Sequence, residues 1–435
     1  GGVPRTKTRS SDPVLQFKLS YRKILGLDGY IGLSDRDRFE PSGETLRLWL
    51  KEPDPMKATK ILVESEAKRV TEDDSDKTSN SDEEDELSDV PTPITTSTQP
   101  RQIEINFPQD RDREVFYPQS LGITVSPCSM ALWKNNGVDA VILAMGFEER
   151  TRVSAERLLD VVRPRKAILV RYSDDQGKEV ADLVRRFGIK SDIITSPEEL
   201  KAVTQEQERV IVDSSGLSKP FLFVAVRDVL KENRSIGITH TLAEHYYPRN
   251  SDLLKLGVEP GKPVPSEIFT RLGEVLMGES GPYELKLVHH EKSSPERWRA
   301  LIASASPKND RLLHLLDARG YDTTRILVPP PTTPRRSVAL TAVELAASAA
   351  ESNVGLIEVD ANDTEGALRE TEKVYKDLYY KSGANVEVGL TGPKIHTVAF
   401  AALAAAARVS FAWYVSPRHF DRSRFTVGVT NTDCF

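Results

Sequence analysis

The chain has few cysteines and histidines and no long apolar run. The two cysteines in 435 residues provide neither a disulfide framework nor the spacing of a cysteine-based zinc site. The seven histidines are scattered, so no metal site is expected. Because no run of about 18 apolar residues and no signal peptide is visible, no membrane partner is expected. These absences favour a cytoplasmic protein.

A large excess of positive charge is also absent, since 59 lysines and arginines stand against 65 acidic residues. The net charge is −6, and the segment 64–89 holds twelve acidic residues against three basic ones. That segment therefore carries −9, and the rest of the chain about +3. A chain of this kind lacks the broad basic surface of a protein that binds duplex DNA. It leaves room for a local basic pocket that holds phosphate.

The N-terminal quarter of the sequence differs from the remainder. Residues 1–63 contain three short segments with strand-like alternation, among them "VLQFKLSY" and "SGETLRLWL", and predict a small β-rich unit. Residues 64–103 are acidic and almost free of large apolar side chains. Such a segment cannot bury enough surface to offset its ordering entropy, so we expect a disordered acidic linker.

Beyond the linker, apolar strands alternate with helices of ten to fifteen residues, and the same order occurs twice. This pattern predicts α/β architecture with parallel sheets. We expect a first Rossmann-like domain at 104–250, a connecting segment at 251–297 with a helix over 266–277, and a second Rossmann-like domain at 298–435. Two such units in one chain indicate an internal duplication of domain-sized copies.

Two strand–turn–helix segments occupy matching places in the two units. They read "VDSSGLSKPFLFVAV" (212–226) and "VGLTGPKIHTVAFAA" (388–402). A helix start offers free N–H groups and a partial positive charge, and a lysine is unfavourable there unless an anion is present. The segments therefore predict phosphate binding at the carboxyl ends of the strands, although ordinary turn chemistry remains an alternative. The candidate ligand-binding residues are Ser215, Gly216, Ser218, Lys219, Thr391, Gly392, Lys394 and His396.

One further loop in each unit follows the first strand of that unit. These loops add the candidate residues Gly146, Arg150, Ser304, Lys308 and Asn309. The loops 243–250 and 416–425 follow the last strands and carry aromatic and basic residues that suit stacking on a base or contact with a polyanion. Helix capping, ring burial and a solvated surface are the structural alternatives.

The turn "VDSSGLSK" resembles the D-[hydrophobic]-T-G-G-T-K motif of CARF domains, the nucleotide-sensing Rossmann-fold parts of many CRISPR-associated effectors. The residues concerned are Asp213, Gly216 and Lys219. "GLTGPK" is similar but lacks the aspartate, and its glycine-to-lysine spacing is one residue shorter. The resemblance covers roughly 137–245 and 298–416. Tandem-CARF and SAVED proteins likewise place two such units in one chain, so the resemblance implies that the two Rossmann-like units form a pseudo-dimer.

The resemblance implies a sensor of antiviral defence. A cyclic or short linear oligonucleotide second messenger would bind between the units, with Lys219 and Lys394 facing its phosphates, and binding would regulate an effector or another defence-system protein. No other cofactor is implied. Two alternatives stay open. One is a ring nuclease or other nucleotide-processing enzyme, for which no catalytic residue is assigned. The other is a ligand-free protein that docks partners.

Overall fold

The computed structural model describes residues 118–126, 128–173, 177–205, 207–232, 235–265, 268, 279–307, 310–349 and 353–435. All of these residues belong to one compact unit. The predicted β-rich unit (1–63) and acidic linker (64–103) lie outside the described residues, as does nearly all of the predicted helix at 266–277.

The first sheet contains five parallel strands and one antiparallel strand. Across the sheet the order is β14-β5-β4-β1-β2-β3, so the parallel strands follow the Rossmann-like order 3-2-1-4-5. Their bounds are β1 (Ala140–Met145), β2 (Lys166–Arg171), β3 (Lys190–Ile194), β4 (Arg209–Asp213) and β5 (Ser235–Thr241).

The second sheet repeats this order in a later part of the chain. Across it the strands run β10-β9-β8-β11-β12-β7, again five parallel strands in the order 3-2-1-4-5 with one antiparallel edge strand. The predicted α/β class with two Rossmann-like sheets is confirmed. The bounds are β7 (Glu279–His290), β8 (Arg299–Ser304), β9 (Thr323–Val328), β10 (Asn353–Glu358), β11 (Asn385–Gly389) and β12 (Phe411–Phe420).

Each sheet is covered by helices on both faces. Alternate residues of the fully buried strand β1 enter two different apolar clusters, as the two-residue period of a strand requires. One face of the first sheet packs against α5 (Glu149–Val161) and α6 (Lys178–Arg186). One face of the second packs against α11 (Asp310–Arg319) and α12 (Pro334–Ala349).

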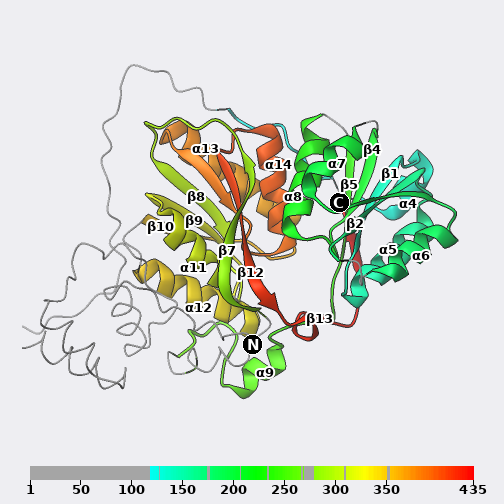
Figure 1. Ribbon diagram of the computed structural model, residues 1–435. Helices are drawn as coiled ribbons and strands as arrows, with labels where there is room; N and C mark the ends of the chain where they lie inside the picture. Colours follow the sequence, from blue (N-terminus) through cyan, green and yellow to red (C-terminus); the bar gives the residue numbers. More distant parts are fainter. Residues whose placement is uncertain are drawn as a thin grey trace, which may run out of the picture. The chain divides into compact units, whose positions relative to one another are not determined.

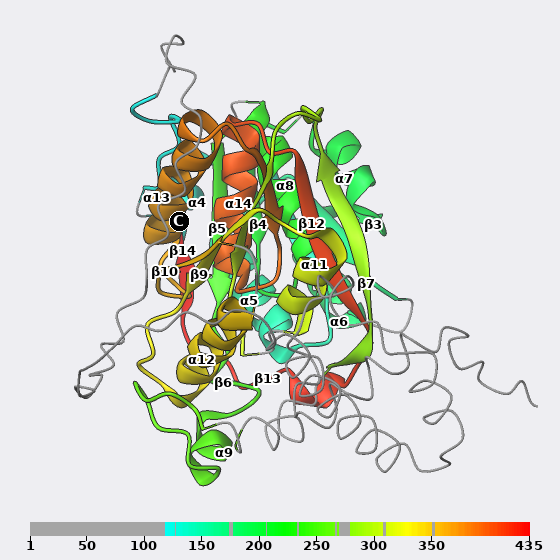
Figure 2. The same cartoon turned by 90° about the vertical axis from the view of Figure 1, so that its left-hand side faces the viewer.

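The remaining faces of the two sheets share one apolar core. The helices α7 (Pro197–Thr204) and α8 (Lys219–Lys231) lie on the first sheet, and α13 (Thr364–Lys376) and α14 (Lys394–Ala406) lie on the second. α8 packs directly against α14, as Figures 1 and 2 show. Both helices are apolar over most of their circumference, which is the pattern of a helix buried on all sides.

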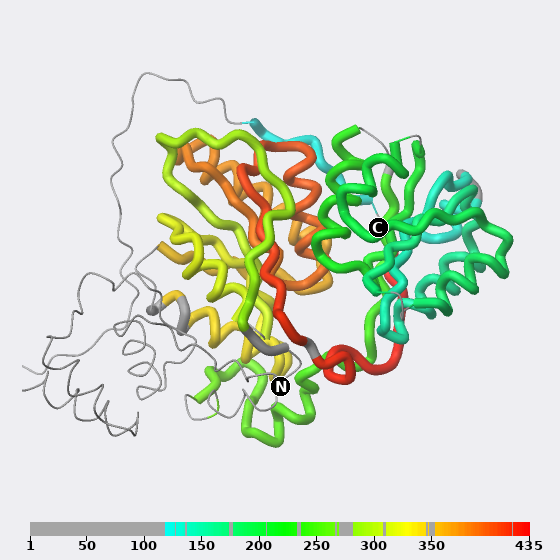
Figure 3. Tube along the Cα trace, in the orientation of Figure 1, coloured from blue at the N-terminus to red at the C-terminus, as the bar shows by residue number. Residues whose placement is uncertain are grey.

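The antiparallel edge strands cross between the units. β7 follows the first unit in sequence but pairs with β12 of the second sheet. β14 (Thr432–Cys434) follows the second unit but pairs with β5 of the first sheet. Figure 3 shows the C-terminal chain, drawn in red, passing from one sheet to the other. Sheet membership therefore departs from the predicted boundary at residue 298.

Several local features differ from the expectations. The segment 416–425, expected as a loop, begins as strand, because β12 continues to Phe420 opposite β7. The helices α4 (Met130–Asn136), α7 and α9 (Asn250–Lys255) were not expected. Among the described residues no helix is both long and apolar enough to cross a membrane.

The shared core yields a stability prediction. Phe400 of α14 is 1% exposed within the core that both sheets share. We expect Phe400→Ala to lower the free energy of unfolding by roughly 3–5 kcal/mol, measured by urea denaturation. Leu254→Ala is the control, because Leu254 is 53% exposed and should cost little. Equal effects of the two substitutions would contradict the shared core.

Candidate functional site

The two lysine-containing turns occupy equivalent positions in their sheets. Each follows the fourth parallel strand, β4 or β11, and each opens the helix that lies at the interface between the units. In each turn a glycine lies against the end of the neighbouring first strand. A Cβ at Gly216 would lie 2.9 Å from Ala144 Cβ of β1 and would overlap Thr151 of α5, and a Cβ at Gly392 would overlap Ser304 at the end of β8. The shorter second turn therefore keeps the packing role of the first.

The lysines of the two turns reach across the interface in a reciprocal way. Lys219 Nζ donates to the carbonyl oxygen of Thr391 at 3.1 Å. Lys394 Nζ donates to the carbonyl oxygen of Ser215 at 2.5 Å. Each ammonium thus contacts the turn of the opposite unit, and the sequence-predicted residues of both turns are brought together.

The two interface helices run in the same direction. Their first residues lie close to the opposite turns, whereas Lys231 at the end of α8 and Ala404–Ala406 at the end of α14 line one pocket. The positive ends of both helix dipoles therefore point to the same edge. Neither N-cap residue, Ser218 or Pro393, makes a side-chain capping hydrogen bond.

Arg150 contributes to this edge as half of a buried ion pair. Its Nε lies 2.9 Å from Glu148 Oε2, and its Nη1 donates to Thr241 O and Tyr246 Oη. Burial acts to raise the pKa of Glu148, but the charges of Arg150 and Lys394 outweigh it and hold that pKa below its ordinary value. Sequence reasoning treated Glu148 as a capping residue and did not foresee this pair.

Lys394 has an unusual protonation equilibrium. Burial lowers the pKa of its ammonium to about 8, and the nearby charge of Arg150 acts in the same direction. Glu148 and Asp213 oppose the shift without cancelling it. Lys394 is therefore a cation near neutral pH, and a negative charge placed beside it would stabilise its charged form.

Asp213 holds the first turn in place by accepting hydrogen bonds from the turn and from its neighbours. Its Oδ1 accepts hydrogen bonds from Ser154 Oγ at 2.8 Å, Ser215 Oγ at 2.6 Å, Ser215 N at 3.1 Å and Thr239 Oγ1 at 3.2 Å. Burial raises the pKa of Asp213, and these hydrogen bonds oppose the shift. The predicted ligand residue Ser215 is fully buried and uses its hydroxyl to hold the turn, so its carbonyl is the group that faces the other unit.

A histidine takes the corresponding supporting role in the second unit. His396 is fully buried, with Nδ1 2.9 Å from Ser304 Oγ and Nε2 3.3 Å from Asp360 O. A carbonyl only accepts, so Nε2 carries the proton and Nδ1 accepts from Ser304. Burial lowers the pKa of His396 to about 4. The neutral imidazole is hydrogen-bonded through both ring nitrogens and so positions the second turn.

Tyr172 was not predicted as part of the site. Its phenol oxygen accepts from Ser218 N at 2.6 Å and lies 3.4 Å from Gly216 O. It follows β2 directly, so it lies at the same edge of the sheet. The only sequence signal was a polar aromatic residue immediately after a strand.

The other predicted site residues are placed as follows. Gly146 lies beside the first turn, since a Cβ on it would be 3.6 Å from Gly216 O. Lys308 and Asn309 lie outside the described residues. The predicted loops 243–250 and 416–425 meet, because Tyr247 N donates to Phe425 O at 3.0 Å. The pairing continues where β6 (His245–Tyr246) lies beside β13 (Thr426–Val427), directly after the second loop.

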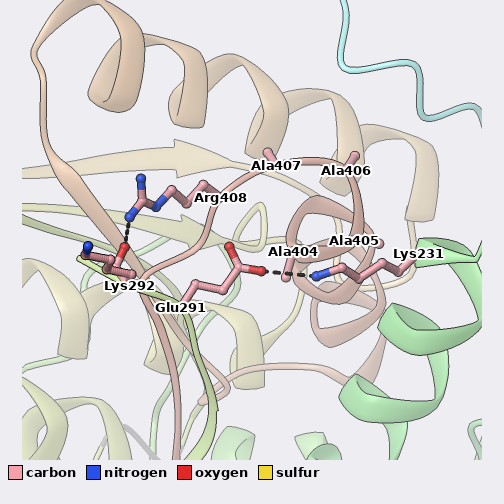
Figure 4. A pocket seen from close by; sticks show the side chains of 8 residues that line it. All are labelled: Lys231, Glu291, Lys292, Ala404, Ala405, Ala406, Ala407 and Arg408. Atoms are coloured by element: carbon pink, nitrogen blue, oxygen red, sulfur yellow. Dashed lines mark hydrogen bonds and ion pairs between the residues drawn. The ribbon is translucent and has the colours of Figure 1, made fainter. Parts of the chain in front are cut away.

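A pocket lies at the C-terminal ends of α8 and α14, away from the two lysine-containing turns, as Figure 4 shows. Lys231 pairs with Glu291 there at 3.3 Å, and Arg408 donates to the carbonyl oxygen of Lys292. Cations near helix C-termini are stabilised by the dipole. The ion pair, the hydrogen bond and the helix dipoles explain why these cations lie at the pocket, so their presence does not require a ligand.

Comparison with known proteins leaves the chain without an assigned family. No family model and no curated sequence matches it. A solved structure described as a type III CRISPR defence DNA nuclease activated by cyclic oligoadenylate is similar at 13% identity and a TM-score of 0.40, covering 64% of this chain and 65% of that one. The match thus spans less than two thirds of that nuclease.

Two other solved structures have lower scores. A universal stress protein from Archaeoglobus fulgidus DSM 4304 matches at 11% identity and a TM-score of 0.20, covering 64% of this chain and 96% of that one. An NAD+-bound xylitol dehydrogenase matches at 9% identity and a TM-score of 0.18, covering 52% and 70%. The fold description therefore rests on the strand order.

Acid should destabilise the protein through His396. Its pKa is lowered to about 4 in the folded state from 6.5, so between those values the unfolded chain binds more protons and stability falls as pH falls. The loss from this group between pH 7 and pH 5 is about 2 kcal/mol. We expect His396→Gln to show a flatter pH dependence of unfolding than wild type. His290→Gln, which changes an exposed histidine, should keep the wild-type slope; an unchanged slope in His396→Gln would refute the assignment.

Proposed function

We propose that this protein is a sensor that binds a cyclic or short linear oligonucleotide second messenger at the edge where α8 and α14 begin, and that binding regulates an effector in antiviral defence. The observation that carries the proposal is the reciprocal contact of Lys219 with Thr391 and of Lys394 with Ser215. It supports a two-sided site for a ligand with repeated phosphates.

The physical basis is a gain in hydrogen-bond strength. Each ammonium now donates to a neutral carbonyl, and a phosphate oxygen would accept the same proton in a charge-assisted bond about twice as strong. The parallel dipoles of α8 and α14 add a favourable field at the same edge. A ligand that takes both lysines would also change the contact between the units, which offers a route to an effector.

The alternatives differ in their support. His396, a predicted site residue whose imidazole could in principle transfer a proton, is neutral and hydrogen-bonded through both ring nitrogens, which favours binding over cleavage. The continuous apolar core between the units favours a protein that docks partners without a nucleotide. A ligand screen separates this alternative from the sensor.

The first test is binding with lysine variants. Wild-type protein should be stabilised by one member of a panel of cyclic di-, tri-, tetra- and hexanucleotides, by roughly 2.7 kcal/mol at a hundred times Kd. Lys219→Ala and Lys394→Ala should each weaken binding about 10- to 100-fold, because each removes a charged hydrogen-bond donor. Thermal shift and calorimetry give the measurement.

Lys231→Ala is the matched control for that experiment. Lys231 ends the same helix but lies at the distant pocket, so this variant should bind like wild type. No stabilisation by any nucleotide, or equal binding by all three variants, would count against the sensor.

The second test uses the pKa of Lys394. Since the pKa is about 8, the ammonium loses its charge between pH 7 and pH 9, and affinity for the nucleotide should fall about ten-fold over that range. Lys394→Arg keeps its charge and should flatten the dependence to less than about two-fold. A wild-type affinity that does not change with pH would show that Lys394 does not contact the ligand.

A further inference from the structure

Arg335 is a cation for which the described residues supply no acidic partner. It is the second residue of α12 and is half-buried. Its Nε is buried and has no hydrogen-bond partner within the described part of the chain. The adjacent Arg336 provides a contrast, because it bonds both carboxylate oxygens of Asp360 at 2.7 and 3.0 Å.

The position of Arg335 connects it with the edge described above. Its guanidinium carbon lies 5.3 Å from the centroid of the Tyr246 ring, and the guanidinium carbon of Arg150 lies 5.5 Å from the same centroid. Arg335 comes from the second unit and Tyr246 from the first. Arg335 therefore lies on the same aromatic ring as Arg150, whose charge in turn acts on Lys394.

The local charges leave a positive excess. Glu148 is paired with Arg150, and Asp360 with Arg336. Among the described residues, Lys394 donates to a carbonyl oxygen and Arg335 faces an aromatic ring. Asp213 is the remaining carboxyl near Lys394, and its Oδ1 is occupied by serine and threonine donors of its own unit.

Arg335 bears three physical costs at this place. Burial disfavours its charge and lowers its pKa to about 10. The start of α12 carries the positive end of a helix dipole, which repels a cation. Within the described part of the chain the charge also has no counter-ion, although a cation–π contact with Tyr246 offsets part of the cost. Such violations of local preference concentrate at functional sites.

The backbone of α12 is not the group that awaits a ligand. Arg335 N donates to Asn250 Oδ1 at 3.2 Å, and Arg336 N donates to Thr333 Oγ1 at 3.3 Å. Pro334 has no N–H. The guanidinium is therefore the donor left available at this helix start.

We propose that Arg335 is an anion-binding residue that receives a phosphate group of the ligand held at the α8–α14 edge. A guanidinium binds phosphate through two parallel hydrogen bonds, and the phosphate supplies the missing counter-charge. That the phosphate belongs to an oligonucleotide rests on the proposed function. The inference that Arg335 binds an anion does not depend on the proposed function.

The test is Arg335→Met, which keeps the apolar stem and removes the charge. In the ligand-free protein it should leave the melting temperature unchanged or raise it, because an uncompensated charge is removed. Sodium tripolyphosphate and the cyclic nucleotide panel should stabilise the wild type, and the variant should bind at least ten-fold more weakly. Arg335→Lys, which keeps a single charge, should be intermediate.

Arg325→Met is the matched control, since Arg325 is also a partly buried arginine of the second unit and bonds neutral oxygens of Thr324 and Asn353 on the β9–β10 side. It should bind both probes like wild type. Wild-type binding retained by Arg335→Met would overturn the inference, as would the failure of both probes to stabilise the wild type.

The two probes separate this inference from the proposed function. If a nucleotide binds equally well to wild type and Arg335→Met, the sensor proposal survives and the role of Arg335 falls. If tripolyphosphate binding depends on Arg335 but no nucleotide binds, the anion site stands and the oligonucleotide sensor falls.

Discussion

The packing of α8 against α14 is the constraint on which the rest of the structure depends. Both helices are apolar on nearly all sides, so they are stable only when each covers the other and its own sheet. Because they run in the same direction, burial also places both helix starts at one edge. The reciprocal lysine contacts and the shared dipole field follow from that packing.

The crossed edge strands reinforce this arrangement. β5 is closed by β14, and β12 is closed by β7. The segment that leads to β14 also meets the first unit at Glu148, to which Thr426 donates at 2.6 Å. The second unit is thus tied to the first through the shared core and through its chain end.

Electrostatics at the edge run against stability. Two ion pairs are internally balanced, whereas Lys394 donates to a carbonyl oxygen and Arg335 faces an aromatic ring in the part of the chain that the structure describes. Burying cations in this way costs free energy that apolar packing elsewhere must offset. An anion with several negative charges is the simplest chemical complement.

The sequence by itself determined the local structure. Apolar runs and helical spacing located the sheets and most helices, and the two turns were identified because glycine and lysine follow a strand and open a helix. The helix α7 also carries a local signal in the sequence, since Ser196 and Glu199 form a capping box around Pro197. Only the tertiary structure decided which distant groups meet: Lys394 with Ser215, Arg335 with Tyr246, and β14 with β5. Such pairings depend on how the whole chain buries its apolar surface, and periodicity within a short window does not contain that information.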